Sequence, residues 1–301
     1  MSDPLSSFSD QLAATVARAG QWVAAVHARH RFDSSGVHWA PGVVVTADHA
    51  LRRDEDISIT LPDGKRVSAE LVGRDPGTDL AVLRASEFSS PVAERAEKTP
   101  APGSVILAVG RFKDSVSASF GVLSSVSGPA KTWRGGQLDQ VVRLDVALHP
   151  AASGGAVVDA EGKLIGMATP VLSRAAVFAI PPATIDRVVT ALLEHGRIPR
   201  GYLGVGLQPV VLPEHLKSKL QLSGKSGLIA ISVDPDAPAG KAGIVIGDVL
   251  IELGGRTVED PEDVQEVLDS GSVGKKLTAR VLRGGSPVTV EVTAGERPRR
   301  S

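Results

Sequence analysis

Between residues 22 and about 180 the chain is a succession of short apolar runs, each ended by turn residues. Runs such as 43–46, 67–72 and 80–84 are separated by turns such as Pro-Asp-Gly-Lys at 62–65. Short runs rich in β-branched residues and broken by glycine or proline favour strands over long helices. With 32 glycines, 20 prolines and only 3% aromatic residues, the core has to be built from Val, Leu, Ile and Ala. This pattern predicts a mainly β protein, folded as a barrel or a sandwich.

Length, charge and cysteine usage narrow the function classes. A chain of 301 residues is expected to form about two domains. The absence of cysteine excludes disulfides, thiolate catalysis and Cys-bound zinc. A formal net charge of -1 disfavours a nucleic-acid partner. No run approaches the ~18–20 apolar residues of a membrane-spanning helix. His27 and His30 lack a third ligand, so neither a metal nor a cofactor is predicted.

Changes in pattern along the chain predict three segments. Residues 1–20 form an N-terminal helical segment, with apolar residues at helical spacing and a stop at Gly20. Residues 21–198 form the strand-rich domain, which ends with a helix over 183–195. Residues 199–298 form a second domain with its own strands and a helix over 261–269. The N-terminus lacks the basic and apolar regions of a signal peptide. The chain as written is therefore expected to be cytoplasmic, or periplasmic if a leader has been removed.

Three residues far apart in the sequence could together form a catalytic site. Ser153 precedes two glycines and an apolar strand, and such a turn exposes Oγ and lets the main chain approach a substrate. His49 ends an apolar strand, and Asp79 begins another. Each residue alone is more often structural, as a loop serine, a histidine bonded to the main chain or a turn cap. Their order, His-Asp-Ser, is that of chymotrypsin-type triads, in which Ser attacks, His takes its proton and Asp orients the imidazole.

Five motifs carry a resemblance to a known family, and they lie at residues 46–50, 75–83, 144–155, 177–181 and 200–205. They resemble the motifs of the HtrA/Deg family of trypsin-like serine proteases, over almost the whole chain. The resemblance implies a chymotrypsin-like double six-stranded antiparallel β-barrel followed by a PDZ domain, which is a small α+β barrel. It also implies an ATP-independent serine endopeptidase that acts on unfolded or damaged proteins.

One departure from the family bears directly on activity. In the family, the N–H groups of the serine and of a glycine two residues earlier form the oxyanion hole; here these positions are Ser153 and Ala151. A left-handed conformation at a non-glycine residue costs about 1–2 kcal/mol. Losing one oxyanion donor costs about 2.7–4 kcal/mol. Two interpretations therefore remain open: a slow or substrate-gated protease, and a pseudo-protease serving as a peptide-binding or chaperone scaffold. His149, an asparagine in the family, is interpreted as a loop residue.

The resemblance also implies binding sites. Val177, Phe178 and Ala179 would line the substrate pocket, with a preference for small or medium aliphatic side chains. The N–H groups of Leu203, Gly204 and Val205 would cradle a peptide C-terminus, and the helix over 261–269 would form the opposite wall of the groove. The expected partners are unfolded polypeptides and peptide C-termini. Phe8 resembles the aromatic residue that packs between subunits in trimeric members, which predicts a homotrimer; the alternative is a contact between the helix and its own barrel.

Overall fold

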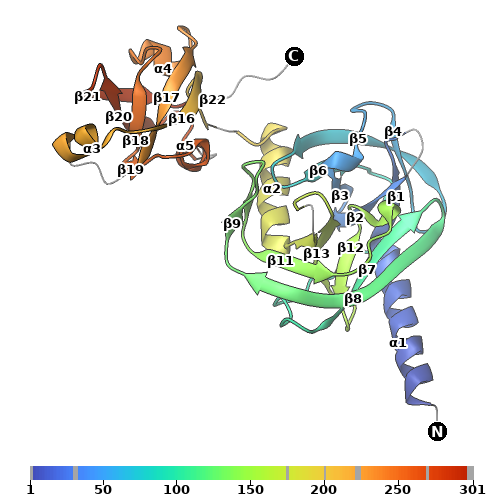
Figure 1. The fold of residues 1–301 in the computed structure, drawn as a ribbon. Helices are drawn as coiled ribbons and strands as arrows, with labels where there is room; N and C mark the ends of the chain where they lie inside the picture. The colour runs from blue at the N-terminus through green and yellow to red at the C-terminus, as the bar shows by residue number, and fades with distance from the viewer. Residues whose placement is uncertain are drawn as a thin grey trace. The chain divides into compact units, whose positions relative to one another are not determined.

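The computed structural model describes residues 3–29, 33–173, 176–199, 201–220, 225–268 and 271–296. The chain divides into two compact units, Met1–Ile198 and Pro199–Ser301 (Figure 1). Each unit is described by itself below.

The first unit contains two closed six-stranded antiparallel barrels, which confirms the predicted fold class. The first barrel has the order β1-β2-β3-β6-β5-β4. Its strands are β1 (Val23–His27), β2 (Ser34–Ala40), β3 (Val43–Ala47), β4 (Ile57–Thr60), β5 (Arg66–Asp75) and β6 (Leu80–Arg84). The second barrel has the order β11-β14-β13-β12-β7-β8. Its strands are β7 (Val105–Phe112), β8 (Ser115–Ser127), β11 (Val141–Asp145), β12 (Ala156–Asp159), β13 (Leu164–Thr169) and β14 (Val177–Ile180).

Helices and short turns complete this unit. The helices are α1 (Pro4–Ala19) and α2 (Pro182–His195), and the single-turn 3₁₀ helices are η1 (Gly20–Trp22), η2 (Asp48–Ala50) and η3 (Pro150–Ala152). The strands β9 (Ala130–Lys131) and β10 (Gln137–Leu138) form a small separate hairpin. Helix α2 ends at Gly196, the predicted stop, which is left-handed with φ 69°. The turn η2 directly follows β3, and the turn η3 precedes β12. The candidate site lies at these two turns.

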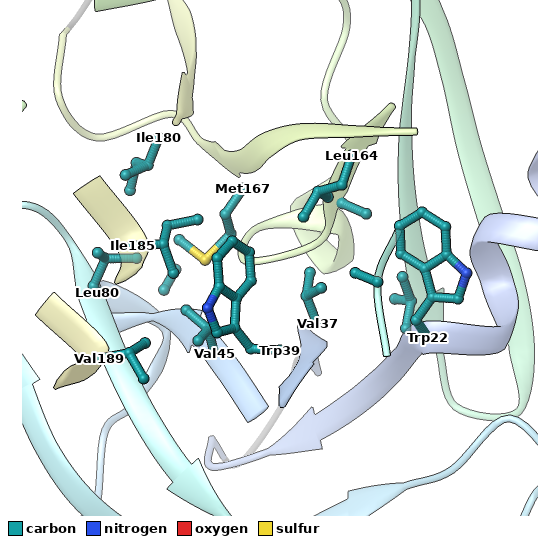
Figure 2. Close-up of a cluster of buried hydrophobic side chains, with 14 of the residues drawn as sticks. Trp22, Val37, Trp39, Val45, Leu80, Leu164, Met167, Ile180, Ile185 and Val189 are labelled. Atoms are coloured by element: carbon teal, nitrogen blue, oxygen red, sulfur yellow. The ribbon is translucent and has the colours of Figure 1, made fainter. Parts of the chain in front are cut away.

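A shared core joins the two barrels into one unit. Trp39 and Val45 come from the first barrel and Met167 from the second, and these side chains pack together with Ile185 of α2 (Figure 2). Along β3 successive side chains alternate between this shared core and the interior of the first barrel, so all five residues are buried. Burial on both faces explains why β3 is a continuous apolar run in the sequence.

The second unit is a sheet of order β16-β17-β18-β20-β21, with β19 paired to β18 and β15 paired to β22. Its strands are β15 (Gly201–Tyr202), β16 (Val205–Val211), β17 (Ser226–Val233), β18 (Val249–Leu253), β19 (Arg256–Thr257), β20 (Lys276–Arg283), β21 (Ser286–Thr293) and β22 (Gly295–Glu296). Its helices are α3 (Glu214–Leu220), α4 (Pro238–Lys241) and α5 (Pro261–Val267). Helix α5 starts with a capping box between Asp260 and Asp263, and the N–H groups of Glu259 and Asp260 lower the pKa of Asp263. In the described part of the chain, no helix has the length and apolarity needed to span a membrane.

Candidate active site

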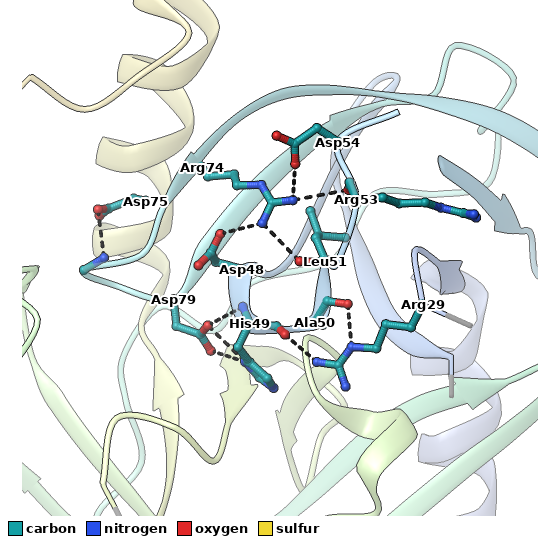
Figure 3. A network of polar contacts seen from close by, with 11 residues as sticks. Arg29, Asp48, His49, Ala50, Leu51, Arg53, Asp54, Arg74, Asp75 and Asp79 are labelled. Carbon is teal, nitrogen blue, oxygen red and sulfur yellow. Dashed lines mark hydrogen bonds and ion pairs between the residues drawn. The ribbon is translucent and has the colours of Figure 1, made fainter. Parts of the chain in front are cut away.

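His49 and Asp79 are joined by hydrogen bonds in the first barrel. His49 lies in η2, directly after β3, and Asp79 lies in the turn between β5 and β6 (Figure 3). His49 Nδ1 is 2.8 Å from Asp79 Oδ2 and 3.0 Å from Oδ1, while the main-chain N–H of His49 donates to Oδ1 at 2.9 Å. A carboxylate can only accept, so Nδ1 carries the proton and Nε2 keeps its lone pair. This is the tautomer that can take a proton from a serine hydroxyl.

Asp79 is held from both barrels. Its side chain is fully buried, and Thr169, at the end of β13 in the second barrel, donates its hydroxyl to Oδ2 at 2.5 Å. The Asp79 carbonyl accepts the N–H of Asp48 at 3.1 Å. Its backbone is left-handed, with φ 60°, a conformation that aspartate tolerates better than most residues. Together with these bonds, the backbone fixes the direction of the carboxylate toward the imidazole.

Ser153 follows η3 and lies against the first barrel. Its carbonyl accepts the N–H of Ser35, on β2, at 2.9 Å. Gly154, next in the chain, has φ 79°, and a Cβ there would come within 2.4 Å of the Ser35 carbonyl oxygen. Only glycine at this position allows the chain next to Ser153 to approach β2 this closely. Within the described chain no hydrogen bond joins His49 Nε2 to Ser153 Oγ; in unliganded proteases this bond is often loose and tightens with substrate.

The two expected oxyanion donors are both engaged within η3. The N–H of Ser153 points to the Pro150 carbonyl, 3.3 Å away, as in a 3₁₀ turn. The N–H of Ala151 donates to Nδ1 of His149 at 3.2 Å. Ala151 does not have a positive φ. The turn is therefore free of the left-handed strain that an open oxyanion hole is predicted to impose on Ala151. In this arrangement each N–H is paired with a group of its own turn.

Ser35 fixes the carbonyl side of the same turn. Its hydroxyl donates to the Ala151 carbonyl at 2.6 Å and accepts the N–H of Arg111 at 2.8 Å. Arg111 is buried, and its guanidinium donates to the carbonyls of Val23 and Gly20. Burial lowers the pKa of Arg111, although Asp114 opposes that shift. The turn that precedes Ser153 is thus tied to β2, β7 and η1 through hydrogen bonds of buried groups.

Two charges next to His49 have shifted pKa values. Burial raises the pKa of Asp48, and the nearby Arg74 guanidinium opposes the rise. Burial also lowers the pKa of Arg29, with Arg52 adding to the effect and Asp79 opposing it. In the described ranges no cluster of three or more His, Asp or Glu residues could hold a metal ion.

The three residues predicted to line the substrate pocket differ in their surroundings. The Ala179 side chain is buried in the interior of the second barrel, so only its main chain could face a substrate. Phe178 is partly buried on the opposite face of β14. Val177 lines a surface hollow together with Asp145, Pro170 and other residues (Leu144, Val146, Ser173, Ala176). Of the three residues, Val177 lines this hollow, on which the Asp145 carboxylate also lies; that the hollow takes a substrate side chain stays a prediction.

In the second unit, the predicted carboxylate loop connects β15 to β16. Gly204 has φ 76°, and a Cβ there would overlap Ala237. The carbonyls of Leu203 and Gly204 accept the N–H groups of Ala239 and Asp234, which fixes the loop. No described residue accepts the N–H of Leu203 or Gly204 through a loop or turn bond, and Val205 begins the edge strand β16. The loop therefore presents main-chain donors beside a strand edge that could take an added strand.

Several residues that contact the candidate site could not be predicted from the sequence. Thr169 and Ser35 lie in ordinary strand sequences, and their contacts to Asp79 and Ala151 arise only when the barrels close. His149 lies in a loop, as predicted, and its side chain also accepts the Ala151 N–H of η3. The available signal is the position directly before Pro150, where Ser, Thr, Asp or Asn often accept a main-chain N–H and where a neutral imidazole nitrogen can accept in the same way.

Comparison with known proteins identifies both units. Residues 34–167 match the trypsin-like peptidase domain, and residues 201–294 match the PDZ domain. A "probable periplasmic serine endoprotease DegP-like" of Brucella suis is 32% identical over 270 residues, covering 85% of this chain and 51% of that protein. A "serine protease Do-like HtrA" of Lactobacillus helveticus is 32% identical and covers 83% of this chain and 64% of its own length. The chain thus spans about half the length of the DegP-like relatives it matches.

Solved structures of similar length agree with this comparison. The HtrA-type protease AlgW with a tripeptide is 30% identical, with a TM-score of 0.71 over 96% of this chain and 98% of that one. The serine endoprotease from Yersinia pestis is 28% identical, with a TM-score of 0.74 over 96% and 98% of the two chains. The double barrel, the PDZ unit and these relatives lead to one conclusion: the chain belongs to the HtrA family of trypsin-like serine proteases.

Proposed function

We propose that this chain is an ATP-independent serine endopeptidase that acts on unfolded or damaged polypeptides, with His49, Asp79 and Ser153 as its catalytic residues. The observation that supports it best is the doubly bonded His49–Asp79 pair, which leaves Nε2 as the free base. Ser153 Oγ attacks the scissile carbonyl and its proton passes to Nε2. The imidazolium, stabilised by Asp79, then protonates the leaving amine, and water releases the acyl group by the reverse sequence.

The second unit would select substrates by their C-termini. A carboxylate would bind the N–H groups of Leu203, Gly204 and Val205, and the peptide would extend along β16. Val264 of α5 is buried in the core of this unit, and Val267 and Leu268 pack against that core, on the helix proposed as the opposite wall. The HtrA-type protease AlgW has been solved with a decapeptide and with a tripeptide, which is consistent with peptide binding by a chain of this kind.

Assembly and location complete the proposal. We infer a homotrimer built through α1, where Phe8 and Phe120 meet edge to face with centroids 6.2 Å apart and both remain exposed. The DegP-like relatives are named as periplasmic, which favours the periplasm and leaves the cytoplasmic expectation without support.

A fluorophosphonate probe and casein test the proposed activity. We expect the probe to label the protein and casein to be degraded, and Ser153→Ala to lose both because the nucleophile is absent. Ser124→Ala, an exposed serine of β8, is the matched control and should behave as the unmodified protein.

The second candidate function is a pseudo-protease that binds polypeptides without cleaving them. The observation in its favour is the pairing of both oxyanion donors inside η3. It predicts binding of unfolded casein, with neither labelling nor cleavage in the presence of peptides that end in a free carboxylate. Labelling of Ser153 under those conditions would contradict it.

A further inference from the structure

Two arginine side chains meet the turn that carries His49 (Figure 3). Arg29, two residues beyond β1, donates Nε to the Ala50 carbonyl at 2.6 Å and Nη2 to the His49 carbonyl at 2.5 Å. Arg74, near the end of β5, donates Nη1 to the Leu51 carbonyl at 3.1 Å and Nη2 to the Arg53 carbonyl at 3.2 Å. The two guanidinium groups thus bind four carbonyls of the segment that begins at His49.

The turn needs such support because it is short. Its own main-chain bond is the one from the Leu51 N–H to the Asp48 carbonyl, at 3.0 Å. A single 3₁₀ turn has poor hydrogen-bond geometry and leaves its last carbonyls unpaired. On the other side, Asp79 accepts both the main-chain N–H and the ring N–H of His49. The turn is therefore held between a carboxylate on its N–H side and two cations on its carbonyl side.

The charge arrangement around this turn is costly for the fold. Arg29 is partly buried, and none of the described carboxylates forms an ion pair with it. Arg74 pairs with Asp48, at 3.3 Å, and with Asp54, while its Nε is buried without a partner. Removing a guanidinium from water is unfavourable unless carbonyls or carboxylates replace the lost hydration. Apolar side chains packed against the turn would avoid this cost but could not donate to its carbonyls, so two guanidinium groups at this place favour a role in positioning the turn.

We propose that Arg29 and Arg74 are positioning residues for the reaction, which hold the His49 turn so that the imidazole keeps its bonds to Asp79 and Nε2 stays available to the proposed nucleophile Ser153. This inference rests on the proposed function of the triad. The forked guanidinium matters because it binds two neighbouring carbonyls at once, whereas an ammonium group binds as a single point. Small displacements of a catalytic group have large kinetic effects, since reacting atoms must be about 3–3.5 Å apart.

Arg29→Met and Arg74→Met test the proposal, with Arg29→Lys and Arg74→Lys as the conservative pair. We expect the Met variants to lose about 10- to 100-fold in kcat for a cleavable peptide, with little change in KM, because the substrate-binding surface is intact. Fluorophosphonate labelling of Ser153 should slow in parallel. The Lys variants should recover part of the rate, and more at Arg74, whose carbonyl contacts are longer. Arg66→Met, an exposed residue on the same strand β5, is the control and should leave kcat unchanged.

A spectroscopic readout separates this inference from the proposed function. The proton between His49 Nδ1 and Asp79 should give a resolved low-field resonance in the unmodified protein, and broaden or disappear in the Met variants. Observing this resonance requires no catalysis. It therefore tests whether the two arginines hold the His49 turn even if the probe never labels Ser153. Absence of labelling would contradict the proposed function but not this inference. If the Met variants do not fold, kcat and the low-field resonance are measured in the Lys variants instead. Unchanged kcat and an unchanged resonance in folded variants would overturn the inference.

Discussion

At the scale of single residues, the state of the proposed oxyanion hole depends on Ala151 and His149. Ala151 keeps a negative φ and donates its N–H to His149, while Ser153 donates to Pro150. Opening the hole requires rotation of the peptide between Pro150 and Ala151, which breaks both bonds. One neutral hydrogen bond contributes about 0.5–1.5 kcal/mol, and the left-handed strain at Ala151 about 1–2 kcal/mol. The two bonds and the strain together cost about 2–5 kcal/mol, which is comparable with the ~2.7–4 kcal/mol that an oxyanion donor supplies in the transition state.

This comparison predicts that removing either term accelerates the enzyme. Ala151→Gly should raise the rate of fluorophosphonate labelling by about 5- to 30-fold, since it relieves about 1–2 kcal/mol of strain. His149→Ala removes the acceptor of the Ala151 N–H and should raise the rate by about 2- to 10-fold. Ala152→Gly adds flexibility to the same turn without changing a proposed oxyanion donor, and serves as the control. If Ala151→Gly labels no faster than the unmodified protein, the alanine is already accommodated.

The same scale shows what could be predicted about the site. His49, Asp79 and Ser153 each lie in a local motif, so they could be predicted as candidate site residues from the sequence alone. Thr169 and Ser35 act on them from strands that are distant in the sequence, and their hydroxyls have no distinguishing pattern. Their roles depend on the approach of two barrels, which local spacing does not encode.

At the scale of elements, strand patterns were the most predictable feature and short helices the least. The apolar run over 80–84 has the bounds of β6, and the helix over 261–269 corresponds to α5, with residue 269 outside the described residues. The helices α3 and α4 were not predicted. They have seven and four residues, so their apolar residues complete too little of the helical period to give a signal.

The strand β2 contains a histidine whose ionisation should affect stability. His38 is buried, stacked on Phe88 at 4.0 Å between centroids, and its Nδ1 lies 3.2 Å from the Pro91 carbonyl. Its Nε2 has no partner among the described residues. Burial lowers the pKa of His38 from its ordinary value of 6.5, because a charge at Nε2 would be neither solvated nor bonded.

A lowered histidine pKa makes the fold less stable in acid. The unfolded chain binds a proton below pH 6.5, while the folded chain resists it until lower pH. The free energy of unfolding should therefore fall as pH drops from 7.5 toward 5, by at most about 1.4 kcal/mol per pH unit for one proton. Denaturant unfolding followed by tryptophan fluorescence measures it, since Trp22 and Trp39 lie in this unit. His38→Phe preserves the stack on Phe88 and should flatten the slope; an equal slope in both proteins would refute this origin.

At the scale of the whole molecule, the first unit behaves as one body because its barrels share a core. Trp39, Val45 and Leu80 of the first barrel pack with Met167 and Ile180 of the second (Figure 2). The composition predicted a core of aliphatic residues with few aromatics, but gave no indication that both faces of β3 would be buried. Because the site is divided between the barrels, substitutions in this shared core should disturb activity and stability together.

Assembly is the remaining feature at this scale, and α1 leaves apolar side chains uncovered. Only Thr15 and Ala19 of α1 are buried, whereas Leu5 is 72% exposed, Phe8 44% and its neighbour Phe120 on β8 53%. Apolar surface that a subunit leaves in water favours association by about 25 cal/mol per Å² when it becomes buried. A trimer that covers Phe8 and Phe120 would bury this apolar surface. The contact between the two rings within one chain is already present, and it leaves both of them exposed.

Replacing Phe8 by serine distinguishes the two interpretations of α1. If subunits meet through this helix, Phe8→Ser should convert the trimer to monomers in sedimentation experiments at micromolar concentration, with the thermal midpoint of the monomer little changed. Leu193→Ser, on the exposed side of α2, removes a similar apolar side chain and should leave the assembly intact. If the unmodified protein already sediments as a monomer and Phe8→Ser lowers its thermal midpoint, Phe8 instead fastens the helix to its own barrel. The exposure of both rings favours the first outcome, because a ring that served only its own barrel would gain more by burying itself against β8.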